Sequence, residues 1–158
     1  MLVLAAVFAL AGELSPWTGR WALDLEASDP IDAIMALQGY TWIERKAAAS
    51  MSVTQVIALE GSHMTVAVRS VLKSSHEDIF IDGVARKQKG RSGLATVTHT
   101  WDPDGSIRTV ATMADGDGCP CALTLIRTVS GDVLDQRFEL VRNDGQRAIV
   151  RRVLRRVL

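Results

Sequence analysis

The chain has 158 residues, of which 47% are hydrophobic, and this length is typical of one domain with a full core. Its 18 Lys and Arg residues balance 18 Asp and Glu residues, so no net field attracts nucleic acid, and no nucleic-acid partner is expected. The two cysteines, Cys119 and Cys121, are too close for an unstrained bridge, which excludes a disulfide framework and fits a reducing compartment.

The first residues bear on the location of the protein. Residues 1–12 are almost wholly apolar and include an Ala-Leu-Ala sequence that resembles a signal-cleavage site, but no basic region precedes it. Three interpretations stay open: an uncleaved extension packed on the domain, a weak or truncated signal, or a start-site artefact. We expect residues 1–15 to be an apolar extension and residues 16–158 to be the domain. The expected location is the cytoplasm, or outside the cell if residues 1–11 are cleaved.

A short helix is predicted to begin near residue 31. Ser28 or Asp29 is a suitable N-cap, and Pro30 suits the first helical position, where its missing N–H costs nothing. Three apolar residues then fall on one face at helical spacing. They are Ile31, Ile34 and Met35.

A second helix is predicted directly after the first. Gly39 suits a left-handed stop, and Thr41 and Glu44 have the spacing of a capping box. Arg45 and Lys46 follow, and then three alanines that favour helix. A single pair of short helices after the first strand of an antiparallel barrel usually closes the barrel mouth. This arrangement indicates a carrier of a small apolar molecule.

The rest of the chain predicts short strands separated by turns. The ten expected strands span residues 20–26, 52–59, 64–71, 77–81, 84–89, 94–101, 106–113, 121–128, 133–141 and 146–154. Hairpin signals such as Asp82-Gly83 and Asn143-Asp-Gly separate them. Even spacing and tight turns predict an all-β fold: a ten-stranded antiparallel up-and-down β-barrel, or β-clam, with a helix-turn-helix lid after the first strand.

The alternation of side chains predicts which residues lie inside the last three strands. It places Gln136 and Phe138 inside, with Arg127 on the preceding strand and Arg152 and Leu154 on the following one. Two buried guanidinium groups repel, and an anionic ligand would relieve them. The alternatives are that each arginine pairs with an interior acid or water, or that the register is shifted by one residue, which would turn every side chain to the other face.

The order of several short motifs resembles the fatty-acid-binding protein family of intracellular lipid-binding proteins, in the calycin superfamily. Trp17, Gly19 and Trp21 match its opening Phe-x-Gly-x-Trp strand. Residues 31–39 and 45–48 match its Phe-Asp-x-Tyr-Met-x-x-x-Gly and Arg-Lys-x-Ala helices. Shorter matches follow at residues 53–54, 61, 70–73, 82–83 and 115–116, so that the resemblance covers about residues 16–155.

The resemblance implies a lidded barrel over a water-filled cavity that carries long-chain fatty acids or similar lipids non-covalently, without enzymatic turnover or a cofactor. It implies that Arg127 and Arg152 hold the carboxylate, and that Leu154 stands where the family has a tyrosine. It also places Leu72 and Lys73 at a portal turn that faces the lid.

Other functions stay open at this point. A retinoid carrier of the same fold is one, and a secreted lipocalin-like carrier is another. The sequence lacks a nucleophile–base pair, which argues against a barrel-shaped enzyme. The three histidines lack metal-ligand spacing, and a plain loop is favoured over a metal site at the Cys-Pro-Cys turn, so no metal is expected.

Basic residues around the expected portal suggest a membrane partner. Arg45, Lys46 and Lys89, together with Lys73 and Arg91, would form a collar that makes transient contact with anionic membranes. The alternative is an ordinary solvated rim. The protein is expected to be a monomer.

Overall fold

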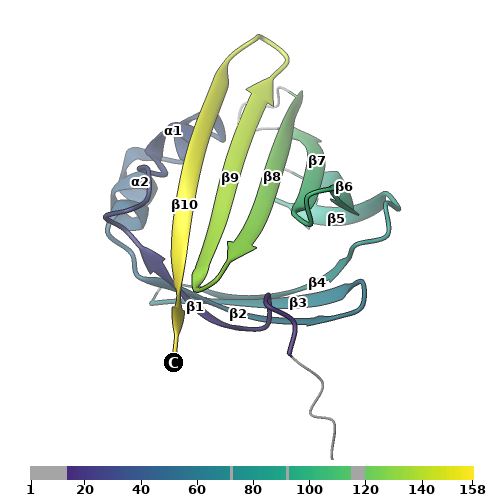
Figure 1. The fold of residues 1–158 in the computed structure, drawn as a ribbon. Coiled ribbons are helices and arrows are strands. Elements are labelled where there is room, and N and C mark those ends of the chain that lie inside the picture. The colour runs from purple at the N-terminus through teal and green to yellow at the C-terminus, as the bar shows by residue number, and fades with distance from the viewer. Residues whose placement is uncertain (1–13, 72, 92, 115–119) are drawn as a thin grey trace, which may run out of the picture.

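The computed structural model describes residues 14–71, 73–91, 93–114 and 120–158. The described residues form ten antiparallel strands and two short helices (Figure 1). Most of the expected N-terminal extension, the portal residue Leu72 and Cys119 lie outside the described residues.

All ten predicted strands and both predicted helices are present. In chain order they are β1 Gly19–Asp24, α1 Asp32–Leu37, α2 Trp42–Ala49, β2 Val53–Glu60, β3 His63–Ser70, β4 Ser74–Phe80, β5 Arg86–Gly90, β6 Gly93–Trp101, β7 Ile107–Ala114, β8 Pro120–Ser130, β9 Val133–Arg142 and β10 Arg147–Val157. Most strand ends differ from the prediction by one to three residues.

The strands form one sheet in the order β4-β3-β2-β1-β10-β9-β8-β7-β6-β5, and every pairing is antiparallel. The sheet curls until its two edge strands, β4 and β5, face each other. A side-chain hydrogen bond bridges this gap: the amide of Gln88 on β5 donates to the carboxylate of Glu77 on β4 over 3.2 Å. The expected ten-stranded β-clam with a lid after the first strand is confirmed.

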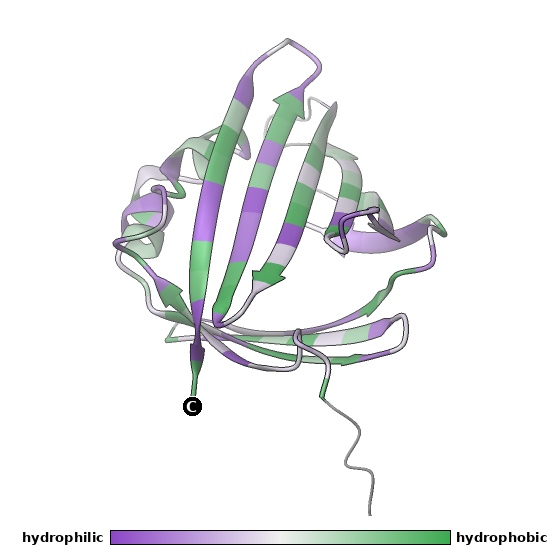
Figure 2. Ribbon diagram, in the orientation of Figure 1, coloured by the Kyte–Doolittle hydropathy of each residue, from purple (hydrophilic) through white to green (hydrophobic). Residues whose placement is uncertain are grey.

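Alternating hydropathy separates the inner and outer faces of the strands, and it shows as bands along β8, β9 and β10 (Figure 2). At the end of the barrel away from the lid, Trp21 is fully buried in the largest apolar cluster, and its indole donates to the Trp17 carbonyl over 3.1 Å. A second cluster lies beneath the lid and contains Ile34 and Leu140. Each large apolar side chain so buried contributes about 1.5–3 kcal/mol.

The predicted cap of α1 is wrong. Ile31 is the N-cap residue, and no side chain caps this helix. Ser28 and Asp29 instead bond to β10: the Val153 N–H donates to the Ser28 hydroxyl over 2.9 Å, and the Arg151 N–H donates to the Asp29 carboxylate over 2.8 Å. They do so because β1 pairs with β10 only from Val153 onward, so that this edge of β10 needs other acceptors.

The second helix begins as predicted. The Glu44 N–H donates to the Thr41 hydroxyl over 3.3 Å, and the Thr41 N–H donates to the Glu44 carboxylate over 2.7 Å, which completes the capping box. Gly39, between the helices, has a φ of 74°, a conformation that favours glycine. The first helix contacts β9, β10 and α2, so the pair of helices lies against one end of the curled sheet.

Candidate ligand-binding site

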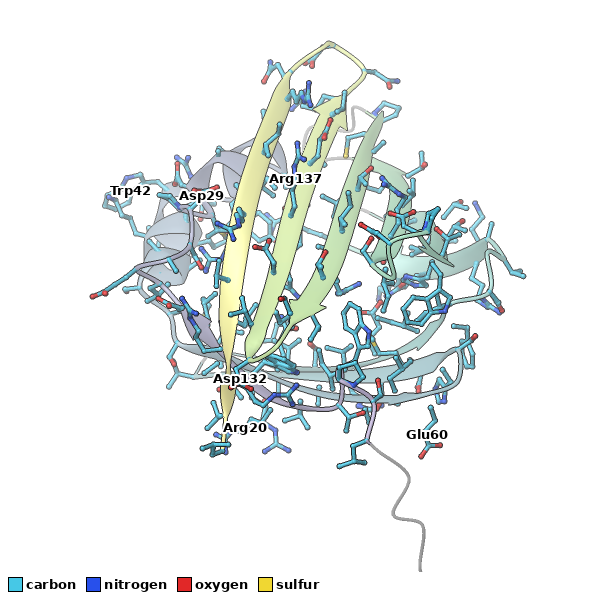
Figure 3. All side chains as sticks on the ribbon, in the orientation of Figure 1. Arg20, Asp29, Trp42, Glu60, Asp132 and Arg137 are labelled. Carbon is cyan, nitrogen blue, oxygen red and sulfur yellow. The ribbon has the colours of Figure 1, made fainter. Side chains whose placement is uncertain are left out.

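Three polar side chains form a row across the inner face of neighbouring strands. Gln136 on β9 is the register partner of Arg127 on β8 and of Arg152 on β10. Their exposed fractions are only 3%, 7% and 8%. Their neighbour Arg137 has the opposite orientation and projects from the outer face of β9 (Figure 3). The structure therefore places all three on the inner face, as the alternation predicts.

Arg127 has few partners. Its Nη1 donates to the Thr109 hydroxyl over 3.1 Å, while its Nε is buried and lacks a hydrogen-bond partner. No carboxylate among the described residues forms an ion pair with it. Burial lowers the pKa of this guanidinium, and the more distant Glu77 carboxylate acts in the opposite direction. Among the described residues, the alternative of a close interior acid does not hold for Arg127.

Arg152 is better satisfied. Its Nη1 donates to the backbone carbonyl of Asp29 over 2.8 Å, next to β10 (Figure 3). Burial lowers its pKa, and the Asp29 carboxylate opposes that effect. Gln136, between the two arginines, exchanges two amide hydrogen bonds with Gln55 on β2, over 3.1 and 3.4 Å. The row is thereby tied across the barrel to β2.

The row continues onto β7 and β6 through residues that the sequence interpretation did not assign to the site. The Thr109 hydroxyl, which accepts from Arg127, is also 2.8 Å from Nδ1 of His99. His99 is 6% exposed, and it shares the inner face of β6 with Ala95 and Val97. The same alternation that identified the arginines would have placed His99 inside, since it follows Ala95 and Val97 at every second position of β6.

Two cavities lead from the lid to this row. One, of about 250 Å³, lies beneath the lid and is lined by Ile31, Ile34, Met35, Gln38, Tyr40, Leu123 and Phe138. The other, of about 130 Å³, reaches the polar row and is lined by Leu23, Ile31, Val53, Gln55, Gln136, Phe138, Arg152 and Leu154. Ile31 and Phe138 line both cavities, so they stand between the apolar space beneath the lid and the polar groups of Gln136 and Arg152.

A third cavity, of about 290 Å³, opens between the edge strands β4 and β5. Its lining is mostly polar. The residues that line it are His76, Glu77, Asp78, Phe80, Arg86, Lys87, Gln88, Val97 and His99. His99 therefore lies between the polar row on one side and this opening on the other.

The predicted rim residues do not line the cavities beneath the lid. Arg45 forms a 3.1 Å ion pair with Asp32, and the Lys46 ammonium lies 5.7 Å from the centre of the Trp42 ring. Lys73 and Lys89 are exposed on the turn before β4 and on β5. The membrane-contact role of these basic residues stays a prediction.

Two absences concern the described residues. No group of three His, Cys, Asp or Glu side chains among them could hold a metal ion. No helix among them is long and apolar enough to cross a membrane.

The fold is similar to that of known proteins whose structures have been solved. No family model and no curated protein matches the sequence. Among solved structures, a lipid binding protein of Caenorhabditis elegans has a TM-score of 0.74 at 18% identity, over 92% of this chain and 99% of its own. A fatty acid binding protein of Schistosoma mansoni, in complex with arachidonic acid, has a TM-score of 0.70 at 20% identity, over 93% and 100%.

A fatty acid-binding protein of Drosophila melanogaster brain has a TM-score of 0.66 at 23% identity, over 88% of this chain and 98% of its own. The fold that the resemblance to fatty-acid-binding proteins implies is thus confirmed. The chain has the β-clam fold of these proteins over nearly their whole length.

Proposed function

We propose that this protein is a non-enzymatic carrier that binds long-chain fatty acids, or similar small hydrophobic anions, non-covalently inside the barrel. The observation that carries the proposal is the polar row on the inner face of the sheet: the smaller cavity reaches Gln136 and Arg152, and Arg127 is the register partner of Gln136 on the next strand. Arg127 has no ion-pair partner among the described residues, and a ligand carboxylate would supply one. That a structural neighbour holds arachidonic acid supports the same class of ligand.

The two cavities would hold different parts of a ligand: the larger one its hydrocarbon chain, and the smaller one its head group. The larger is mostly apolar, and burial of a hydrocarbon chain there supplies about 0.8 kcal/mol per CH₂. The polar row adds orientation and a preference for an anion. Because Ile31 and Phe138 stand between the cavities, we expect these two side chains to move apart when a long chain binds.

One observation favours a second candidate. Leu154, 1% exposed, lines the smaller cavity beside Arg152, where the resembled family has a hydroxyl. An apolar residue there suits a less polar head group, as in a retinoid or another neutral lipid of similar size. The lack of a disulfide framework favours the cytoplasm as the place of action in both cases.

The test is titration calorimetry of delipidated protein with oleate and with oleyl alcohol, which share a chain and differ in charge. The fatty-acid proposal expects both to bind, and oleate to bind more tightly. Equal affinities would remove the carboxylate role and favour the neutral-lipid candidate. If neither bound, the carrier proposal itself would be wrong.

A further inference from the structure

A single hydroxyl connects a buried histidine to Arg127 of the proposed site. Thr109 Oγ1 lies 2.8 Å from Nδ1 of His99 and 3.1 Å from Nη1 of Arg127. The three side chains come from the adjacent strands β6, β7 and β8, and both charged or chargeable members are more than nine-tenths buried.

The donor and acceptor roles in this chain of hydrogen bonds depend on the tautomer of His99. A guanidinium only donates, so the Thr109 oxygen accepts from Arg127. The hydroxyl has one proton, and the group in position to accept it is Nδ1 of His99. In the tautomer that accepts the Thr109 proton, the imidazole is neutral and carries its own proton on Nε2, so the hydroxyl has no proton left to donate to a ligand.

We propose that His99 is a positioning residue of the anion site and couples anion binding to the uptake of one proton. When a proton from solvent binds Nδ1, the imidazolium donates to Thr109, and the hydroxyl proton becomes free to be donated to an anion beside Arg127. The Thr109 oxygen can accept from both neighbours at once, because it has two lone pairs. This inference rests on the proposed function, since it requires an anion at Arg127.

Burial lowers the pKa of His99, and the nearby Arg127 guanidinium lowers it further. An anion that neutralises Arg127 removes the second cause, so it must raise the pKa of His99. Reciprocally, a protonated His99 must raise the affinity for the anion, because the two equilibria are linked.

Other charged groups face His99 from the packed elements. Glu77 on β4 and Asp82 raise its pKa, and Arg86 on β5 lowers it. Asp82 and Arg86 form an ion pair of 2.6 Å, so their effects on His99 largely offset each other. His76, Asp78, Lys87 and Gln88 line the same opening as His99. Arg127 is therefore the neighbour whose charge a ligand in the barrel would change.

The experiment measures binding to the full chain between about pH 5 and pH 8, where histidine titrates. The probe is dodecyl sulfonate, which keeps its charge over this range, with dodecanol as the uncharged comparison. We expect the sulfonate affinity to rise as the pH falls, by at most about tenfold per pH unit because one proton is taken up, and the dodecanol affinity to stay constant.

Variants separate His99 from other histidines. His99→Gln should flatten the pH profile for the sulfonate, and so should Thr109→Val, which removes the hydroxyl at similar volume. His76→Gln is the matched control, because His76 is exposed at the rim of the same opening, and it should keep the wild-type slope. Sulfonate binding that is independent of pH in the wild type would overturn the coupling but not the carrier. No binding of either amphiphile would overturn the carrier proposal.

A second measurement does not depend on the variants. NMR titration of the imidazole resonances of the wild type should show that the sulfonate raises the pKa of His99. An unchanged pKa of His99 in the presence of bound sulfonate would overturn the inference.

Discussion

From the environment of Arg127 we predict that its replacement has opposite effects on ligand binding and on stability. We expect Arg127→Gln to weaken oleate binding by about tenfold to a hundredfold, because a hydrogen bond to a charged group contributes about 1.5–3 kcal/mol. Without ligand, the variant should melt at the same temperature as the wild type or higher, since a buried charge without an ion-pair partner is removed. Calorimetry and thermal melts measure the two effects.

Arg152→Gln is the matched control for that comparison. Arg152 donates to the Asp29 carbonyl, so its removal leaves an acceptor beside β10 without this donor and should lower the melting temperature. A large loss of stability in Arg127→Gln as well would mean that Arg127 has a stabilising partner in the folded protein.

His99 predicts how stability changes with pH. Burial and Arg127 lower its pKa in the folded protein, so the unfolded chain binds more protons in the range of its titration. The contribution of His99 is then fully present above its unfolded pKa of about 6.5 and is lost as the pH falls below it. Urea melts of ligand-free protein at neutral and mildly acidic pH should show this loss, and His99→Gln should reduce it. An equal loss in both proteins would assign the effect to other groups.

At the scale of elements, the turn between β5 and β6 is attached to the lid by Arg91. Its guanidinium lies 3.8 Å from the centre of the Tyr40 ring, 3.6 Å from the Glu44 carboxylate and 3.4 Å from the Gly39 carbonyl. These contacts join the lid to the residue that follows the edge strand β5. An exposed ion pair and a cation–π contact each contribute up to about 1 kcal/mol.

We therefore expect Arg91→Ala to speed the release of a bound fatty acid severalfold, because the lid opens more readily. Stopped-flow displacement of a fluorescent fatty acid measures the rate. Lys89→Ala removes a nearby exposed cation and is the control that should leave the rate unchanged. If both variants released ligand at the wild-type rate, the Arg91 contacts would not restrain the lid.

At the scale of the whole molecule, the rim has less free positive charge than its basic residues suggest. Asp32 pairs with Arg45, and Glu44 lies 3.6 Å from Arg91. The second helix also exposes apolar side chains: Trp42 is 64% exposed and projects away from the sheet (Figure 3), and Ile43 is 73% exposed. The rim therefore combines basic side chains, some of them paired with acids, with exposed apolar side chains.

This surface leads to a prediction for the transfer of fatty acid to vesicles. If the rim contacts anionic bilayers, the transfer rate should rise with vesicle concentration and anionic lipid content and fall with salt. A fluorescent fatty acid reports the rate, and Lys46→Ala with Lys89→Ala should lower it on anionic vesicles only. A rate insensitive to all three conditions would indicate transfer through water and an ordinary solvated rim.

The sequence by itself determined the features that depend on near neighbours. The capping box of Thr41 and Glu44, the stop at Gly39 and the alternation that places Arg127 and Arg152 inside each require only a few adjacent residues, because backbone geometry repeats every two residues in strands and every 3.6 in helices. The order of these elements was enough to predict the lidded β-clam.

Only the tertiary structure decided what residues far apart in the chain do to one another. Ser28 and Asp29 have the pattern of a helix cap, yet they bond to β10 residues more than 120 positions away, since an unpaired strand edge needs acceptors. His99 looked like an ordinary mid-strand residue until the pairing register placed Thr109 opposite it on β7, within reach of Arg127 on β8. Hydrogen bonds and charges act through space, so their partners follow from how the strands and loops are placed side by side and not from spacing along the chain.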